Sequence, residues 1–137
     1  MNREPHVTSV LAAERELGGA VYDFTLLPTD PIQIDAGPVV AAIAADVRAG
    51  VPAARIAAKF HAALAEVTVQ LLVQLRAQTG VGVVALSGGV FQNVTMLGLV
   101  NDGLKDAGFM VLNHEKTPPN DGGLALGQAV LGGRAQV

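Results

Sequence analysis

The sequence contains no cysteine and few charged residues. The absence of cysteine excludes a disulfide framework, a thiolate zinc site, an iron–sulfur cluster and a cysteine nucleophile supplied by this chain. Charged residues make up 15% of the 137 positions, with nine Lys and Arg, twelve Asp and Glu, and a formal net charge of −3. Because the chain has no basic cluster, its charge pattern argues against nucleic acid as a partner.

Apolar residues are abundant by contrast and make up 50% of the chain. This content is high for a soluble monomer with so few charges, and it predicts that part of the apolar surface is covered by another domain or chain. The length is enough for one ordinary domain and too short for two. We therefore expect residues 1–137 to form a single domain around one core.

Two further absences concern targeting. The start of the chain, residues 1–6, is polar and lacks the apolar stretch of a secretory signal, so we expect a cytoplasmic location. Residues 77–101 carry no charge, but Ser87, Gly88, Gly89 and Asn93 lie in their middle. Such residues would leave polar groups unsatisfied in hydrocarbon, which argues against a membrane partner.

The first half of the chain predicts a hairpin followed by two helices. Residues 21–26 and 32–34 alternate apolar and polar side chains around a proline-containing break. We expect Asp35 to cap a helix that runs to Arg48, and Pro52 to begin a longer helix that ends near Gln78. The apolar residues of this longer helix recur at spacings of three and four: Ile56, Phe60, Leu64, Val67, Leu71 and Leu75.

The second half predicts a strand, a helix and a parallel strand. Residues 81–86 form a continuous apolar run, as expected of a strand covered on both faces. A helix over 93–107 and a strand over 109–112 follow, and a last helix covers 121–131. The connection is long enough for a right-handed crossover, so the fold class is α/β, with an early antiparallel pair joined to a later parallel unit.

Two glycine pairs, 88–89 and 122–123, lie where an extended segment leads into a helix. Glycine allows a ligand to approach the backbone closely, and the helix that follows offers unpaired N–H groups to an anion. This is the outline of a phosphate or nucleotide site, although a tight turn without a ligand needs the same residues. The first pair is neither a P-loop nor a dinucleotide fingerprint, because the required Lys and third Gly are missing.

Five polar residues are candidates for chemistry. Asn93 either caps the helix that follows the first glycine pair or binds a ligand. Asp121, on a proline-stiffened loop, is either a helix cap or an oxygen ligand for a cation. His6, His61 and His114 lack the spacing of metal ligands, and no Ser-His-Asp or paired-carboxylate pattern is present.

Two long motifs then point to a family. Residues 84–93, Val-Ala-Leu-Ser-Gly-Gly-Val-Phe-Gln-Asn, and residues 117–129, Thr-Pro-Pro-Asn-Asp-Gly-Gly-Leu-Ala-Leu-Gly-Gln-Ala, closely resemble the C-terminal end of the HypF-type carbamoyltransferases, which mature nickel–iron hydrogenases. Residues 56–61 are similar to the Ala-Arg-Phe-His segment of that family. The resemblance extends over roughly residues 35–131.

The resemblance implies a fold. The catalytic module of the family is similar to TsaD-type tRNA-modifying enzymes and to the O-carbamoyltransferases of antibiotic synthesis. It has two lobes of the actin/hexokinase-like (RNase H-like) fold, with ATP between them. This chain looks like the second, C-terminal lobe, for which we expect a mixed sheet flanked by helices.

The resemblance also implies a function. In the family, carbamoyl phosphate and ATP give a carbamoyl-adenylate, and the carbamoyl group passes to the C-terminal cysteine of HypE on the way to the cyanide ligands of the hydrogenase. By resemblance, Gly88, Gly89 and Asn93 match the nucleotide-contacting turn. Asp121 matches a ligand of a divalent metal, which is iron, zinc or magnesium.

The chain also departs from the family pattern. The other metal ligands of the family are the two histidines of a His-x-x-x-His motif in the first lobe, and this sequence has no such motif. Residues 8–14 differ from the Tyr-Glu-Gly-Gln-Ala-Ala type of segment expected there. We therefore expect the chain to be inactive alone, as a fragment or split product that needs the missing N-terminal lobe or upstream domains. The alternatives are a lobe that carbamoylates a small-molecule hydroxyl, and a non-catalytic module that docks through its apolar face.

Overall fold

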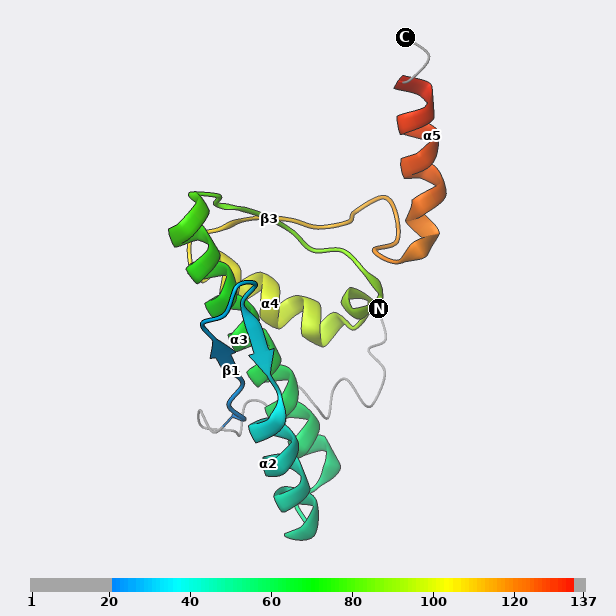
Figure 1. Ribbon diagram of the computed structural model, residues 1–137. Helices are drawn as coiled ribbons and strands as arrows, with labels where there is room; N and C mark the ends of the chain where they lie inside the picture. Colours follow the sequence, from blue (N-terminus) through cyan, green and yellow to red (C-terminus); the bar gives the residue numbers. More distant parts are fainter. Residues whose placement is uncertain (1–20, 135–137) are drawn as a thin grey trace. The chain divides into compact units, whose positions relative to one another are not determined.

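The computed structural model describes residues 21–134, so the expectations for residues 1–6 and 8–14 and for His6 lie outside the described residues. The chain divides into two compact units, which meet in sequence between Val81 and Gly82 (Figure 1). We call the described residues 21–81 the first unit and residues 82–134 the second unit. The prediction of a single domain over 1–137 stays a prediction.

The first unit begins with the predicted hairpin. Strand β1 (Thr25–Leu27) pairs antiparallel with β2 (Gln33–Asp35), and Leu26 lies opposite Ile34. Both strands are short, because prolines at positions 28 and 31 limit the ladder on either side of the turn.

Helix α2 (Gly37–Arg48) follows β2 directly. Its N-cap is Ala36, so the prediction that Asp35 caps this helix is wrong. The Asp35 carboxylate instead accepts the N–H of Gly37 at 2.8 Å, two residues along the chain. Asp35 is the last residue of β2, and its side chain makes a local turn bond before the helix begins.

Helix α3 (Ala53–Thr79) is the longest element and confirms the prediction of a long second helix. It begins after Pro52 and ends at Gly80, which takes the left-handed conformation with φ of +74°. Among the described helices, α3 alone is long and apolar enough to cross a membrane. Core helices of soluble proteins meet the same criteria, and α3 carries four charged residues: Arg55, Lys59, Glu66 and Arg76.

The core of the first unit forms where the residues just before β1 meet α2 and α3. Tyr22, Val39 and Ala63 are buried together. The rings of Phe24 and Phe60 pack at 6.1 Å between centroids in a tilted arrangement. Apolar residues from the segment before β1 and from α2 and α3 complete this cluster: Val21, Ala42, Ile43 and Ile56.

The second unit contains the predicted crossover. Strand β3 (Val83–Ala85) pairs in parallel with β4 (Met110–Leu112), and α4 (Val94–Asp106) connects them. Met96, Val100 and Leu104, spaced four residues apart, form the buried face of α4. The described strands thus form two separate two-stranded sheets, one antiparallel and one parallel.

The prediction that the 81–86 strand is covered on both faces is wrong for this chain. Val84 is half-buried, whereas Val83, on the opposite face of β3, is 48% exposed. Met110 and Leu112 of β4 are exposed in the same way. One face of the parallel pair is therefore open among the described residues, because α4 is the helix of this unit that contacts the pair.

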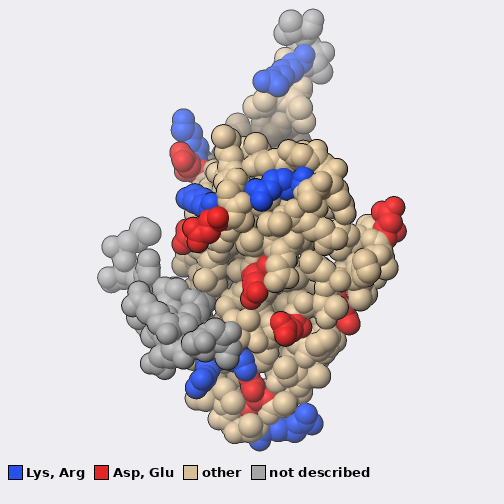
Figure 2. Space-filling model, turned by 90° about the vertical axis from the view of Figure 1, so that its left-hand side faces the viewer, with Lys and Arg blue, Asp and Glu red and all other residues tan. Residues whose placement is uncertain are grey.

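Exposed apolar side chains also mark the last helix, α5 (Leu124–Arg134), which buries none of its residues. Its large exposed residues are Leu124, Leu126, Val130 and Leu131. Figure 2 shows Lys, Arg, Asp and Glu side chains scattered over one face with wide uncharged areas between them. The structure therefore exposes apolar side chains, and the cover by another domain or chain stays a prediction.

Candidate functional site

The turn after β3 has a backbone that only glycine adopts readily. Gly88 has φ of 105° and ψ of 162°, a region in which any side chain is strained. The short 3₁₀ turn η1 (Gly89–Gln92) follows. A Cβ atom at Gly89 would meet no atom within 4 Å. The backbone of this turn therefore faces open space, as close approach of a ligand requires.

Asn93 caps helix α4. Its side-chain oxygen accepts the N–H groups of Thr95 at 3.0 Å and Met96 at 3.2 Å. This confirms the capping role that the sequence predicts. A ligand contact from Asn93 stays a prediction.

The loop before α5 is tightly built around Asn120. The Asn120 side chain accepts the N–H of Gly122 at 3.0 Å and so caps the 3₁₀ turn η2 (Asp121–Gly123). A Cβ atom at Gly122 would lie 3.0 Å from the Asn120 oxygen, and one at Gly123 would lie 3.1 Å from the carbonyl oxygen of Pro118. A side chain at either glycine would therefore press on its neighbours, so the loop is closely packed at these two positions.

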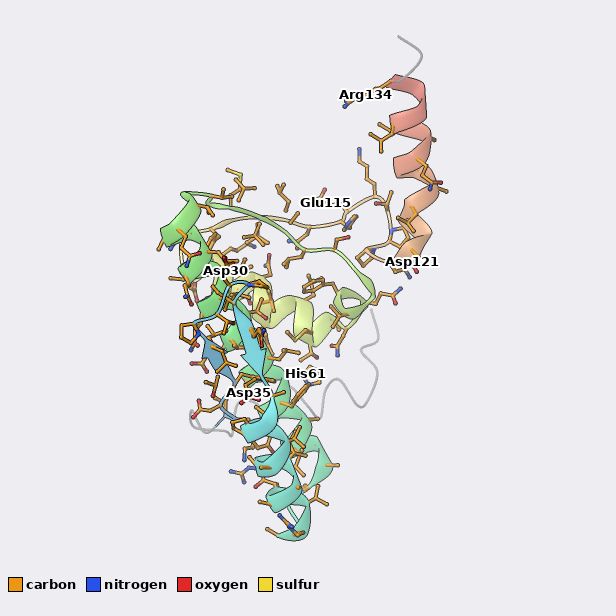
Figure 3. The ribbon with its side chains drawn as sticks, viewed as in Figure 1. Asp30, Asp35, His61, Glu115, Asp121 and Arg134 are labelled. Carbon is orange, nitrogen blue, oxygen red and sulfur yellow. The ribbon has the colours of Figure 1, made fainter. Side chains whose placement is uncertain are left out.

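The alternative role of Asp121 as the helix cap is wrong, because Asn120 holds that position. Asp121 is the first residue of η2 and is exposed. Figure 3 shows it where the loop meets α5, with Arg134 near the other end of the helix. The two charges lie at the ends where the helix dipole favours them. The Asp121 carboxylate is thus accessible to a cation or a partner.

The structure brings the two motifs into contact. The N–H of Gly88 donates to the carbonyl oxygen of Pro119 at 2.6 Å, and the hydroxyl of Ser87 donates to the same oxygen at 3.3 Å. Ser87 and Pro119 are 32 positions apart in the sequence. The glycine turn and the loop that carries Asp121 therefore form one local site.

His114 is a member of this site whose contacts the sequence did not predict. Its Nε2 atom lies 3.2 Å from Ser87 Oγ, and its Nδ1 atom lies 3.1 Å from Thr117 Oγ1. The sequence spacing typical of metal ligands does not indicate such a residue, because its partners are hydroxyl groups. The available signal is its place just before the motif of residues 117–129.

A complete metal site is not formed by the residues that the structure describes. Within 21–134, no group of three or more His, Asp and Glu side chains is arranged to hold a metal ion. Asp121 offers one carboxylate, which is a fraction of the ligand set that a divalent metal needs. A resident metal would therefore need further ligands from outside the described residues.

A second polar cluster, in the first unit, was also not predicted. The Asp46 carboxylate accepts hydrogen bonds from Tyr22 and from Lys59, each at 2.6 Å, and the Lys59 ammonium lies 4.3 Å from the centre of the Tyr22 ring. The hydrogen bonds from Lys59 and Tyr22 lower the pKa of Asp46. Burial, with the hydrogen bond to Asp46, raises the pKa of Tyr22 to about 12. This cluster joins the residues before β1 to both α2 and α3.

Comparison with known proteins identifies the family. Residues 9–128 match the family described as "Carbamoyltransferase, Kae1-like Domain, second subdomain". The chain belongs to the HypF carbamoyltransferase family. The resemblance given by the two motifs is therefore confirmed, and so is the α/β fold class.

Individual HypF proteins agree with this result. Carbamoyltransferase HypF of Synechocystis sp. is 44% identical over 73 residues, which are 53% of this chain and 9% of that protein. Carbamoyltransferase HypF2 of Cupriavidus necator is 38% identical over 117 residues, which are 81% of this chain and 14% of that protein. The crystal structure of full-length HypF in the phosphate- and nucleotide-bound form matches with a TM-score of 0.79 and 34% identity, over 90% of this chain and 17% of that one.

These alignments show how much of a HypF protein the chain covers. It covers between 9% and 17% of the length of these three HypF proteins, in the region of the Kae1-like second subdomain. The larger remaining parts of those proteins have no counterpart in this sequence. Activity, substrates and partners of a whole HypF protein are therefore matters of proposal for this chain.

Proposed function

We propose that this chain is the nucleotide-binding lobe of a HypF-type carbamoyltransferase and that it works only together with a first lobe. The observation that carries the proposal is the hydrogen bond from Gly88 N–H to Pro119 O, which joins the two family motifs into one site. The match to a HypF whose solved structure is nucleotide-bound supports it.

The residues of the site would hold ATP through its phosphates. Gly88 provides the sharp turn, and the space beside Gly89 admits a phosphate close to the backbone. The N–H groups of Gly89 and Val90 would donate to phosphate oxygens, and Asn93 would contact the ligand as the family motif implies. The low charge of the chain is compatible with this mode, because backbone donors replace lysine or arginine.

The reaction proposed for the complete enzyme is carbamoyl transfer. Carbamoyl phosphate loses its phosphate to water and leaves carbamate, whose oxygen attacks the α-phosphorus of ATP with pyrophosphate as leaving group. The cysteine sulfur of a HypE-type acceptor then attacks the carbamoyl carbon, loses its proton, and displaces AMP. In this scheme the chain described here binds and orients the nucleotide, and the acceptor provides the thiol that this chain lacks.

Asp121 is the one residue of this chain that we propose as a ligand of a divalent metal. Its carboxylate would provide one ligand, and the first lobe would provide the others, since the described residues do not form a ligand set. A cytoplasmic location is part of the same proposal.

Calorimetric titration with ATP tests the proposal. We expect weak or no heat with the chain alone and clear binding when a HypF first lobe is added. The chain alone should show no carbamoyl-phosphate-dependent exchange between ATP and pyrophosphate. Absence of heat in both titrations would contradict nucleotide binding and favour a docking module, whereas exchange by the chain alone would contradict the need for a first lobe.

A further inference from the structure

A chain of hydrogen bonds runs through His114 from one motif to the other. Thr117 Oγ1 lies 3.1 Å from His114 Nδ1, His114 Nε2 lies 3.2 Å from Ser87 Oγ, and Ser87 Oγ lies 3.3 Å from the carbonyl oxygen of Pro119. His114 and Ser87 are 27 positions apart. A serine and a histidine at this distance have the appearance of a nucleophile and its base.

The direction of the bonds excludes that reading. The carbonyl oxygen of Pro119 only accepts, so we assign the single hydrogen of the Ser87 hydroxyl to this contact. Ser87 Oγ must then accept from His114, so Nε2 carries a hydrogen. A nitrogen that carries a hydrogen cannot take the serine proton, and the Ser87 oxygen is therefore not activated for attack.

The remaining ring nitrogen follows from this assignment. In neutral imidazole only one nitrogen carries a hydrogen, so Nδ1 accepts from the Thr117 hydroxyl. In the imidazolium form Nδ1 donates to Thr117 instead, and Nε2 still donates to Ser87. The link from His114 to Ser87 is thus available in both protonation states of the ring.

We infer that His114 is a positioning residue that fixes the turn of residues 87–89 against the loop of residues 117–121. Ser87 and Gly88 share the Pro119 oxygen, and His114 holds the Ser87 hydroxyl in the orientation that makes this sharing possible. The inference deepens the proposed function: this link sets the distance between the nucleotide-contacting turn and Asp121 before any ligand arrives.

Nitrogen-15 NMR of the full 137-residue chain tests the assignment directly, without any nucleotide. At a pH where the imidazole is neutral, we expect His114 to be the tautomer with hydrogen on Nε2. Hydrogen on Nδ1 would overturn the inference.

Amide hydrogen exchange at Gly88 tests the link itself. In His114→Ala the exchange of this amide should become several-fold faster, because the Ser87 hydroxyl loses its orientation. His114→Gln keeps an N–H donor at the end of its side chain and should restore slow exchange. His61→Ala, in the first unit, is the control histidine and should leave Gly88 unchanged. Equal exchange in wild type and His114→Ala would overturn the inference.

ATP binding and turnover of the assembled enzyme distinguish a positioning role of His114 from a role in acid–base chemistry. With a HypF first lobe present, His114→Ala should weaken ATP binding several-fold, and His114→Gln should bind and turn over like the wild type. Loss of turnover in His114→Gln with unchanged ATP affinity would show proton transfer at His114 and overturn the positioning role. If the wild type binds no ATP while the NMR and exchange results hold, the proposed function fails and the structural link stands.

Discussion

The two units use similar polar groups in opposite ways. In the first unit, Tyr22, Asp46 and Lys59 satisfy one another close to the core, and Tyr22 is only 4% exposed. In the second unit, Ser87 and His114 make longer bonds in solvent, beside glycines with empty space in front of them. A part-buried cluster whose polar groups satisfy one another contributes to stability, whereas an exposed one with room for a ligand is suited to binding.

Apolar side chains within the second unit also differ in burial, and two leucines test what that difference means for stability. Leu104 of α4 is fully buried, and Leu131 of α5 is 69% exposed. Leu104→Ala should lower the free energy of unfolding by about 2–5 kcal/mol, through lost burial and a cavity. Leu131→Ala should change it by less than about 0.5 kcal/mol. Urea denaturation followed by circular dichroism measures both.

A large decrease in the free energy of unfolding of Leu131→Ala would contradict the exposed position of Leu131. It would mean that α5 is covered in solution by another copy of the chain. Sedimentation of the wild type at several concentrations would then show self-association.

Substitutions at the two glycines of the turn should affect different properties, one the stability of the fold and the other the binding of ATP. Gly88→Ala forces a side chain into a backbone region with φ of 105° and should destabilise the chain by about 1–3 kcal/mol. Gly89→Ala meets no neighbouring atom, so stability should stay within about 0.5 kcal/mol. Its methyl group would occupy the space proposed for a phosphate and should weaken ATP binding in the assembled enzyme at least tenfold. Unchanged ATP affinity in Gly89→Ala would contradict the nucleotide site.

The cluster of Tyr22, Asp46 and Lys59 in the first unit should make stability depend on pH in the alkaline range. Because the pKa of Tyr22 rises to about 12 on folding from an ordinary 10.0, the unfolded chain loses this proton first. The contribution of Tyr22 is therefore complete below pH 10 and is lost as the pH rises through about 12. Tyr22→Phe should cost about 1 kcal/mol at neutral pH and remove this part of the alkaline loss. Parallel alkaline curves for wild type and variant would contradict the assignment.

The sequence predicts the elements of both units better than it predicts the clusters. The spacing of apolar residues locates α3 and the β3–α4–β4 crossover, because these patterns depend on local periodicity. The Asn93 cap is local too, and it was predicted. The cap assigned to Asp35 fails by one position, since a strand and a helix compete for the same residue.

The missed contacts are long-range. Asp46 and Lys59 meet across two helices, and Ser87 meets both His114 and Pro119 from distant segments. No periodicity encodes these pairs, because they depend on how elements pack. The open face of β3 was missed for another reason: an apolar run indicates that a strand is to be covered and not which chain covers it.

The smallest effect on stability, and the sharpest test of the exposed site, belongs to Asp121. It is exposed and makes no cap, so Asp121→Asn should change the free energy of unfolding by less than about 0.5 kcal/mol. Glu115→Gln removes the same charge from an exposed position in the same loop and is the matched control (Figure 3). In the assembled carbamoyltransferase, Asp121→Asn should lower the bound metal measured by elemental analysis, and Glu115→Gln should not. Equal metal content in the two variants would contradict the role of Asp121 as a metal ligand.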